Sequence, residues 1–170
     1  MSEVGPSPEV PPDWESLARA ASLVDAEDAA VQDERQLLSF ELDGSPYAIP
    51  VERVREIVRM RPVTPIPRVS PDVRGVVSLR GEIIEVIDLR RRLGLEASEP
   101  TRRSRIIVTR SEEGEVAAFL VDAVREVVTL SEEAIRPAAG SESGFVEALC
   151  ALGDRFVSML NLDRVLAIDV

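Results

Sequence analysis

Apolar and polar positions alternate over short stretches between residues 36 and 168, which is the pattern of strands with one buried face rather than of helices. The first half of this region predicts strands at residues 37–42, 47–49, 76–79 and 83–87. Residues 51–58 could start as one helical turn and end as a strand through Ile57 and Val58. Arg80-Gly81 is expected at the tip of the last hairpin, because glycine tolerates the positive φ that a two-residue turn requires. Asp88 is expected to cap a short helix over residues 89–93.

The second half repeats this order of signals. It predicts strands at residues 105–109, 116–121, 124–130, 145–152 and 156–160, followed by a helical end at 162–166. Residues 51–58 read VERVREIV and residues 121–128 read VDAVREVV, so five of eight positions are identical. A second pair of matching segments contains Gly81 and Gly153, in the same order and at nearly the same offset. These matches favour a duplicated unit of about 65–70 residues over chance similarity between strands.

Five short strands per copy fit a small closed barrel, and one such barrel alone would have a thin core. Two barrels packed side by side would bury a shared face. The sequence therefore predicts an all-β fold with short helices, in which residues 36–168 form one domain of two duplicated barrel subdomains.

The first 35 residues differ in character from the rest. Residues 1–34 contain nine acidic residues and one arginine, which account for most of the net charge of −11 on the whole chain. Four prolines lie among the first twelve residues, so we expect residues 1–35 to form a disordered acidic leader. Within it, Asp13 could cap a short helix over residues 13–24. That helix is either a fraying segment without a role or a docking segment anchored by Trp14.

The residue types limit the possible chemistry. The chain has no histidine, and all 20 basic residues are arginine, which excludes histidine bases, histidine metal ligands and lysine Schiff bases. The single Cys150 excludes an internal disulfide and is expected in the core. We therefore predict no enzyme activity, no cofactor and no metal site. The alternative is an enzyme that uses two carboxylates, such as Glu82 and Asp88.

Location and partner class follow from similar arguments. No apolar stretch approaches the roughly 18 residues of a membrane span, and the N-terminus lacks a signal peptide, so a cytoplasmic location is expected. The arginines are interspersed with acidic residues rather than gathered in a basic stripe, which argues against nucleic-acid binding.

The motifs along residues 36–168 resemble those of the CheW family of chemotaxis coupling proteins. The matching segments, in family order, are residues 37–44, 47–57, 73–76, 79–90, 121–127, 135–137 and 152–155. The ordered set with its spacing is specific, although no single segment is decisive. Two positions depart from the family pattern: Ser78 stands where Asn is frequent, and Glu85 stands where Pro is frequent.

The resemblance implies two five-stranded SH3-like β-barrels and a non-catalytic adaptor function. Such adaptors join the cytoplasmic tips of methyl-accepting chemoreceptors to the regulatory domain of a CheA-type histidine kinase, in arrays beneath the membrane. The sequence does not separate a flagellar chemotaxis pathway from a related chemosensory pathway with another output, such as surface motility.

The resemblance also assigns a receptor-binding groove between the barrels. The expected groove residues are Val54, Glu56, Ile57, Gly75, Arg80, Gly81 and Val127. Arg80 at a hairpin tip could form two hydrogen bonds to a carboxylate or carbonyl, and Glu56 would be the matching acid. The alternative for Val54, Ile57 and Val127 is a place in the core, since β-branched residues are most often buried. Arg80 and Glu56 could likewise be solvated surface charges.

Overall fold

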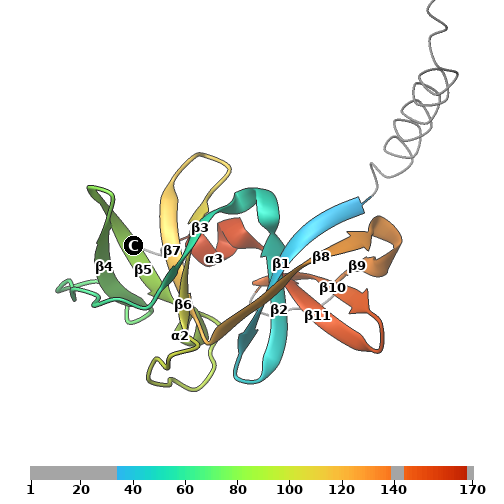
Figure 1. The fold of residues 1–170 in the computed structure, drawn as a ribbon, viewed down its shortest axis with the longest axis horizontal. Coiled ribbons are helices and arrows are strands. Elements are labelled where there is room, and N and C mark those ends of the chain that lie inside the picture. Colours follow the sequence, from blue (N-terminus) through green and yellow to red (C-terminus); the bar gives the residue numbers. More distant parts are fainter. Residues whose placement is uncertain (1–33, 139–143, 168–170) are drawn as a thin grey trace, which may run out of the picture. The chain divides into compact units, whose positions relative to one another are not determined.

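The computed structural model of the chain describes residues 34–138 and 144–167. Strands predominate in these residues, and the predicted all-β class is confirmed (Figure 1). None of the helices in the described part of the chain has the length and apolar character that a membrane span needs. The leader helix predicted over residues 13–24 lies outside the described residues.

The strands form two sheets (Figure 1). Sheet A has the order β8 (Ala123–Ser131), β1 (Glu34–Leu42), β2 (Ser45–Pro50), β11 (Arg155–Leu160), β10 (Val146–Leu152) and β9 (Ile135–Pro137). Sheet B has the order β3 (Val54–Arg59), β6 (Arg105–Arg110), β7 (Val116–Val121), β5 (Glu82–Asp88) and β4 (Val73–Leu79). The strand positions expected from the alternation are thus found along both halves of the chain.

Each sheet combines strands from both halves of the chain, which corrects the expectation of one barrel per copy. β1 and β2 of the first half lie in sheet A with β8 to β11, whereas β3, β4 and β5 lie in sheet B with β6 and β7. Two parallel pairs join the halves, β2 with β11 and β5 with β7. The hydrophobic pattern predicts strands and turns because these are local, but it carries no signal for which distant strands pair.

The two sheets nevertheless follow one plan. Exchanging β1, β2, β3, β4 and β5 with β6, β7, β8, β10 and β11, respectively, converts the order of sheet B into that of sheet A, apart from the added β9. Each final hairpin leads into a short helix, α2 (Leu89–Arg92) or α3 (Leu162–Leu166). The predicted cap is confirmed, since the Asp88 carboxylate accepts a hydrogen bond from Arg91 N–H, and Asn161 does the same for Arg164 N–H. This correspondence is what a duplicated unit predicts.

Three apolar clusters form the core. One cluster draws side chains from both sheets and both helices, including Phe40, Ile107, Phe119, Leu89 and Val165. The other two belong to sheet A and its flanks and to sheet B. Cys150 is buried in the sheet A cluster, as the sequence predicts. The shared cluster is the apolar contact expected between two units that are too small to be stable alone.

The chain passes between the sheets at two short crossovers. The 3-10 turn η2 (Val51–Arg53) connects β2 in sheet A with β3 in sheet B. Asp122 alone separates β7 in sheet B from β8 in sheet A. After β8, the turn η3 (Glu132–Ala134) leads into β9. The crossovers therefore lead into the two strands, β3 and β8, that carry four of the seven expected groove residues: Val54, Glu56, Ile57 and Val127.

Candidate functional site

The hairpin between β4 and β5 has a tight tip formed by Arg80 and Gly81. Leu79 pairs with Glu82 in the ladder, which leaves the two residues between them to form the turn. Both have positive φ, 49° at Arg80 and 83° at Gly81, and the turn that twists correctly for a hairpin requires this at both central positions. The turn projects the Arg80 side chain into solvent, where it is exposed.

Two ion pairs connect this tip to β3. Arg80 Nη2 lies 3.3 Å from Glu56 Oε2, and Arg55 Nη1 lies 2.8 Å from Glu82 Oε2. β3 is one end of sheet B, and the β4–β5 hairpin is the other end. The two ion pairs therefore join the two ends of sheet B. We call the seven residues Arg55, Glu56, Ile57, Arg80, Gly81, Glu82 and Ile83 the hairpin-tip surface.

The structure thus brings together part of the expected groove. Glu56 and Arg80 are direct partners, and Ile57 is an exposed neighbour of Glu56 on β3. Val54, at the start of β3, is half-buried and packs against the shared cluster. Val127 is exposed on β8, which is the edge strand of the other sheet. Ile57 and Val127 hold equivalent places on the edge strands of the two sheets. That both residues line one groove stays a prediction.

Gly75 has a structural requirement of its own. Its φ is 143°, and a Cβ built at this position would lie 2.0 Å from the carbonyl oxygen of Thr64. Thr64 forms an isolated bridge with Val76, with N–H to O distances of 2.9 Å in both directions. The glycine allows the segment before β4 to lie against the strand, and in this way it supports the hairpin indirectly.

Three residues of the hairpin-tip surface were not expected: Arg55, Glu82 and Ile83. Ile83 is 77% exposed, although it is a large apolar residue in a strand. Phe156 holds the equivalent place after the β10–β11 hairpin and is 67% exposed. The duplication was the signal that could have revealed them, because each apolar residue follows its hairpin tip by the same interval.

Glu85 lies two residues after Ile83 on β5 and is one of the two departures from the family pattern noted above. Its Oε1 atom is buried and has no hydrogen-bond partner among the described residues. Burial raises the pKa of Glu85 because the charged form is less well solvated. This carboxylate therefore departs from the usual pairing of buried polar groups.

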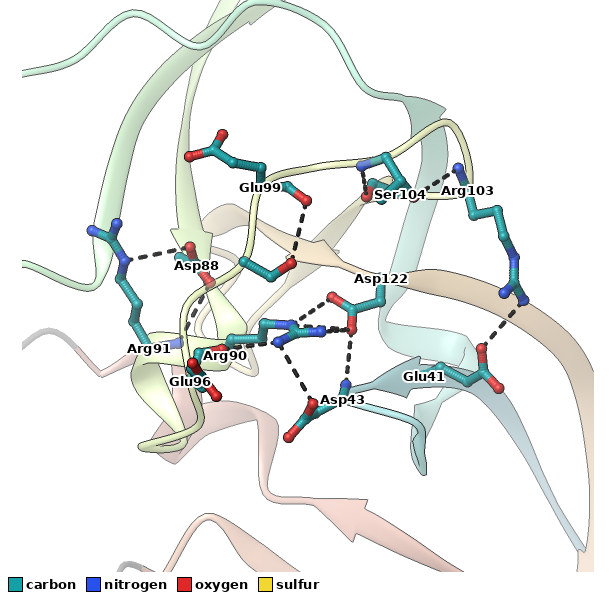
Figure 2. A network of polar contacts seen from close by, with 12 residues as sticks. Glu41, Asp43, Asp88, Arg90, Arg91, Glu96, Glu99, Arg103, Ser104 and Asp122 are labelled. Carbon is teal, nitrogen blue, oxygen red and sulfur yellow. Dashed lines mark hydrogen bonds and ion pairs between the residues drawn. The ribbon is translucent and has the colours of Figure 1, made fainter.

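A second group of charges surrounds Asp122 at the crossover into β8 (Figure 2). Arg90 of α2 donates from Nε to Asp122 Oδ1 at 2.9 Å and from Nη2 to Asp122 Oδ2. The backbone N–H of Asp43, in the β1–β2 turn, donates to Asp122 Oδ2 at 2.8 Å. Burial alone would raise the pKa of Asp122, but these hydrogen bonds and the Arg90 charge lower it below its usual value.

A cavity of about 650 Å³ adjoins this group of charges. It is lined by Glu41, Arg90, Thr101, Arg102, Arg103 and Asp122, among others. Arg103 and Arg125 both pair with Glu41, and these two arginines lower the pKa of Glu41. Two of the arginines that line the cavity, Arg90 and Arg103, therefore already have acidic partners within the chain.

The carboxylates offered as a catalytic pair do not converge. Glu82 and Asp88 stand at opposite ends of β5, about 20 Å apart at the rise of a strand, whereas glycosidase carboxylates lie about 5–10 Å apart. Glu82 pairs with Arg55, and Asp88 caps α2 and pairs with Arg74. No group of three metal-binding side chains occurs within residues 34–138 and 144–167. Glu82 and Asp88 therefore do not form the carboxylate pair that a glycosidase needs.

Comparison with known proteins gives one consistent result. The profile of the CheW-like domain matches residues 36–169. The chemotaxis protein CheW of Rhizobium meliloti is 35% identical over 135 residues, which are 77% of this chain and 86% of that protein. CheW of Bacillus subtilis is 36% identical over 110 residues, 65% of this chain and 70% of that protein.

The fold agrees with the sequence comparison. The crystal structure of the scaffolding protein TtCheW from Thermoanaerobacter tengcongensis superposes with a TM-score of 0.75 at 30% identity. The match covers 79% of this chain and 94% of that chain.

Proposed function

This chain belongs to the CheW-like family, and from that premise we propose that it is a non-catalytic adaptor coupling chemoreceptors to a CheA-type histidine kinase. The hairpin-tip surface is the observation that carries the proposal. It combines paired charges of both signs with the exposed apolar side chains of Ile57 and Ile83. Such a combination suits protein recognition, in which apolar contact supplies affinity and charge supplies specificity.

We place the receptor tip against β3, the β4–β5 hairpin and β8. The groove residues would be Val54, Glu56, Ile57, Gly75, Arg80, Gly81 and Val127. Arg80 is exposed, and an ion pair of 3.3 Å between Nη2 and Glu56 Oε2 joins it to β3. It therefore has donors left for a carboxylate or carbonyl of a helical partner.

We place the kinase regulatory domain at a separate surface. The resemblance to the family implies a contact between barrels, and the exposed Phe156 on β11 offers an apolar anchor away from β3. Association with receptors would bring the protein to the cytoplasmic face of membrane receptor arrays. No cofactor, metal or nucleic acid has a part in this function.

A second candidate is the same adaptor role in a pathway with another output. The protein FrzA of Myxococcus xanthus is 31% identical over 80 residues, 47% of this chain and 50% of that protein. The overlap is shorter than with the chemotaxis proteins named above. Deleting the gene and scoring swimming and surface motility separately would distinguish the two pathways.

Titration calorimetry tests the adaptor proposal directly. The protein is titrated with the regulatory domain of the histidine kinase encoded nearest to it, and separately with a soluble helical hairpin from a receptor tip. Saturable binding to both is expected. Absence of binding to the kinases and receptors of the same genome, with all proteins folded, would refute the proposal.

Arg80→Glu separates the two surfaces. The variant repels Glu56, yet exposed ion pairs contribute only about 0–1 kcal/mol, so folding should be preserved. We expect weaker binding of the receptor hairpin and unchanged binding of the kinase domain. Arg102→Glu makes the same charge change at another exposed arginine and is the matched control. Equal loss of both partners would contradict the division into two surfaces.

A further inference from the structure

The charges around Asp122 have a counterpart at the other crossover. Arg53, in η2, donates from Nη2 to Asp163 Oδ2 of α3 at 2.9 Å. The backbone N–H of Glu112, in the β6–β7 turn, donates to Asp163 Oδ1 at 3.2 Å. Arg53 also donates to the carbonyl oxygen of Arg110 at 3.2 Å. A crossover, a hairpin turn and a helix are thus joined around one carboxylate.

The Asp122 group joins the same three kinds of element. Asp122 is the crossover residue, Asp43 belongs to a hairpin turn, and Arg90 belongs to a helix. Arg90 also donates to a carbonyl oxygen, that of Glu96, at 2.9 Å. Even the long ion pairs correspond, since Arg90 lies 3.7 Å from Asp43 Oδ1 and Arg53 lies 3.7 Å from Glu112 Oε1. We call these two groups the Asp122 latch and the Asp163 latch.

The polarity of the two latches is reversed. In the Asp122 latch the helix carries the arginine and the crossover carries the aspartate, whereas in the Asp163 latch the helix carries the aspartate. Arg90 and Asp163 are both the second residue of their helices, α2 and α3. The crossover partners are not equivalent, because Arg53 corresponds to Ala123, one residue after Asp122. The two halves therefore reach the same connection with different residues.

Each latch connects the two sheets. The Asp122 latch ties α2, which continues from β5 of sheet B, to the β1–β2 turn of sheet A. The Asp163 latch ties α3, which continues from β11 of sheet A, to the β6–β7 turn of sheet B. Each also sits where an edge strand begins, since Arg53 directly precedes β3 and Asp122 directly precedes β8.

From this placement we infer that the two latches are positioning devices that fix the orientation of sheet A relative to sheet B, and with it the spacing of the groove strands β3 and β8. The apolar contact between the sheets is non-directional and tolerates small rotations. The latches are directional. In the Asp122 latch, paired hydrogen bonds from Arg90 fix the plane of the carboxylate. In the Asp163 latch, Arg53 and the Glu112 backbone N–H each donate to one oxygen of the carboxylate. The two arginines are well shielded, with side-chain exposures of 15% at Arg90 and 18% at Arg53.

The distance between β3 and β8 tests the inference. Spin labels at cysteines replacing the exposed Arg59 and Thr129 report on the two strands, and Cys150 stays in place because it is fully buried. Arg90→Gln and Arg53→Gln, singly and together, remove the latch cations. We expect a shifted or broadened distance distribution, greatest in the double variant. Hydrogen exchange at Phe40 and Phe119 amides should stay slow, which shows that both sheets persist.

Two further variants make the test specific. Arg103→Gln removes an arginine that pairs with Glu41 but belongs to neither latch, and it should leave the distances unchanged. The double variant Arg90→Asp with Asp122→Arg restores the ion pair with reversed polarity and should restore the narrow distribution. If Arg90→Gln proves too unstable, Asp163→Asn tests the other latch. A wild-type distribution in every latch variant would overturn the inference.

The functional part of the inference rests on the proposed receptor binding. The receptor-tip hairpin should bind about tenfold more weakly to the double Arg→Gln variant, although neither residue is in the groove. Altered distances with unchanged affinity would overturn the link to the groove. Wild-type protein that fails to bind the hairpin would refute the proposed function, while the distances would still decide whether the latches set the sheet orientation.

Discussion

Substituting alanine at Gly75 should destabilise the protein far more than the same change at Gly81. Both glycines have positive φ, but they differ in their surroundings. A Cβ at Gly75 would meet Thr64 O at 2.0 Å, Thr64 C at 2.6 Å and Pro65 Cα at 2.9 Å. A Cβ at Gly81 would meet no described atom within 4 Å. The pair therefore separates backbone strain from steric clash.

The magnitude at Gly75 follows from two contributions. The unfavourable φ costs about 1–3 kcal/mol for a residue with a side chain. The clash is with backbone, so the segment at Thr64 must move and lose two hydrogen bonds to Val76, each contributing about 0.5–1.5 kcal/mol. We expect Gly75→Ala to lower the free energy of unfolding by about 3–5 kcal/mol. Gly81→Ala should lower it by only about 1–2 kcal/mol, the cost of a side chain in the left-handed region without a clash.

Urea denaturation followed by circular dichroism measures both values. At this chain length a loss of 1 kcal/mol corresponds to a shift in melting temperature of about 2–4 °C, so calorimetry offers an independent check. A Gly75→Ala protein as stable as Gly81→Ala would refute the reasoning. It would mean that the segment at Thr64 moves with little loss of stability. The glycine at position 75 would then have to serve partner binding rather than folding.

Three other measurements address different parts of the molecule. Asp122→Asn should destabilise the protein at neutral pH, and the difference in stability from wild type should vanish in acid. The pKa of Asp122 is lower in the folded than in the unfolded protein, so the carboxylate stabilises the fold above the unfolded pKa. This stabilisation is lost as the pH falls through the folded pKa. A pH-independent difference in urea titrations would contradict this. Glu85→Gln should raise stability slightly at neutral pH, since burial raises the Glu85 pKa and disfavours the charged form; an unchanged or lower melting temperature would count against it. Removing residues 1–34 should leave the melting temperature nearly unchanged, because their acidic, proline-rich composition cannot build a core; a large fall in calorimetry would show otherwise.

The sequence predicted those features that depend on neighbours along the chain. The Arg80-Gly81 tip, the Asp88 cap and the burial of Cys150 are all found. Each follows from a local rule about turns, caps or residue size. The partition of strands between the sheets was wrong, because pairs such as Tyr47 with Ser158 join segments that share no local pattern.

The hairpin-tip surface was predicted only in part. Glu56 and Arg80 were expected because of the family motif, and in the structure the two side chains form an ion pair. Arg55 and Glu82 form a second pair that no sequence rule indicates, since the contact joins β3 to β5, two strands that are not neighbours in sheet B. The exposure of Ile83 could not be predicted from the sequence. Alternation along a strand shows which residues share a face, but not which face is packed against the rest of the protein.

The exchange of strands between the two halves affects how the protein must be made. β2 leaves the ribosome early, yet its neighbour β11 is synthesised more than a hundred residues later, since Tyr47 pairs with Ser158. At typical translation speeds β2 therefore waits roughly 5–20 s with one edge unpaired. A chain truncated after the first half would present open edges in both incomplete sheets, and these are sites for aggregation. Nascent chains should thus depend on chaperones until the last hairpin has emerged.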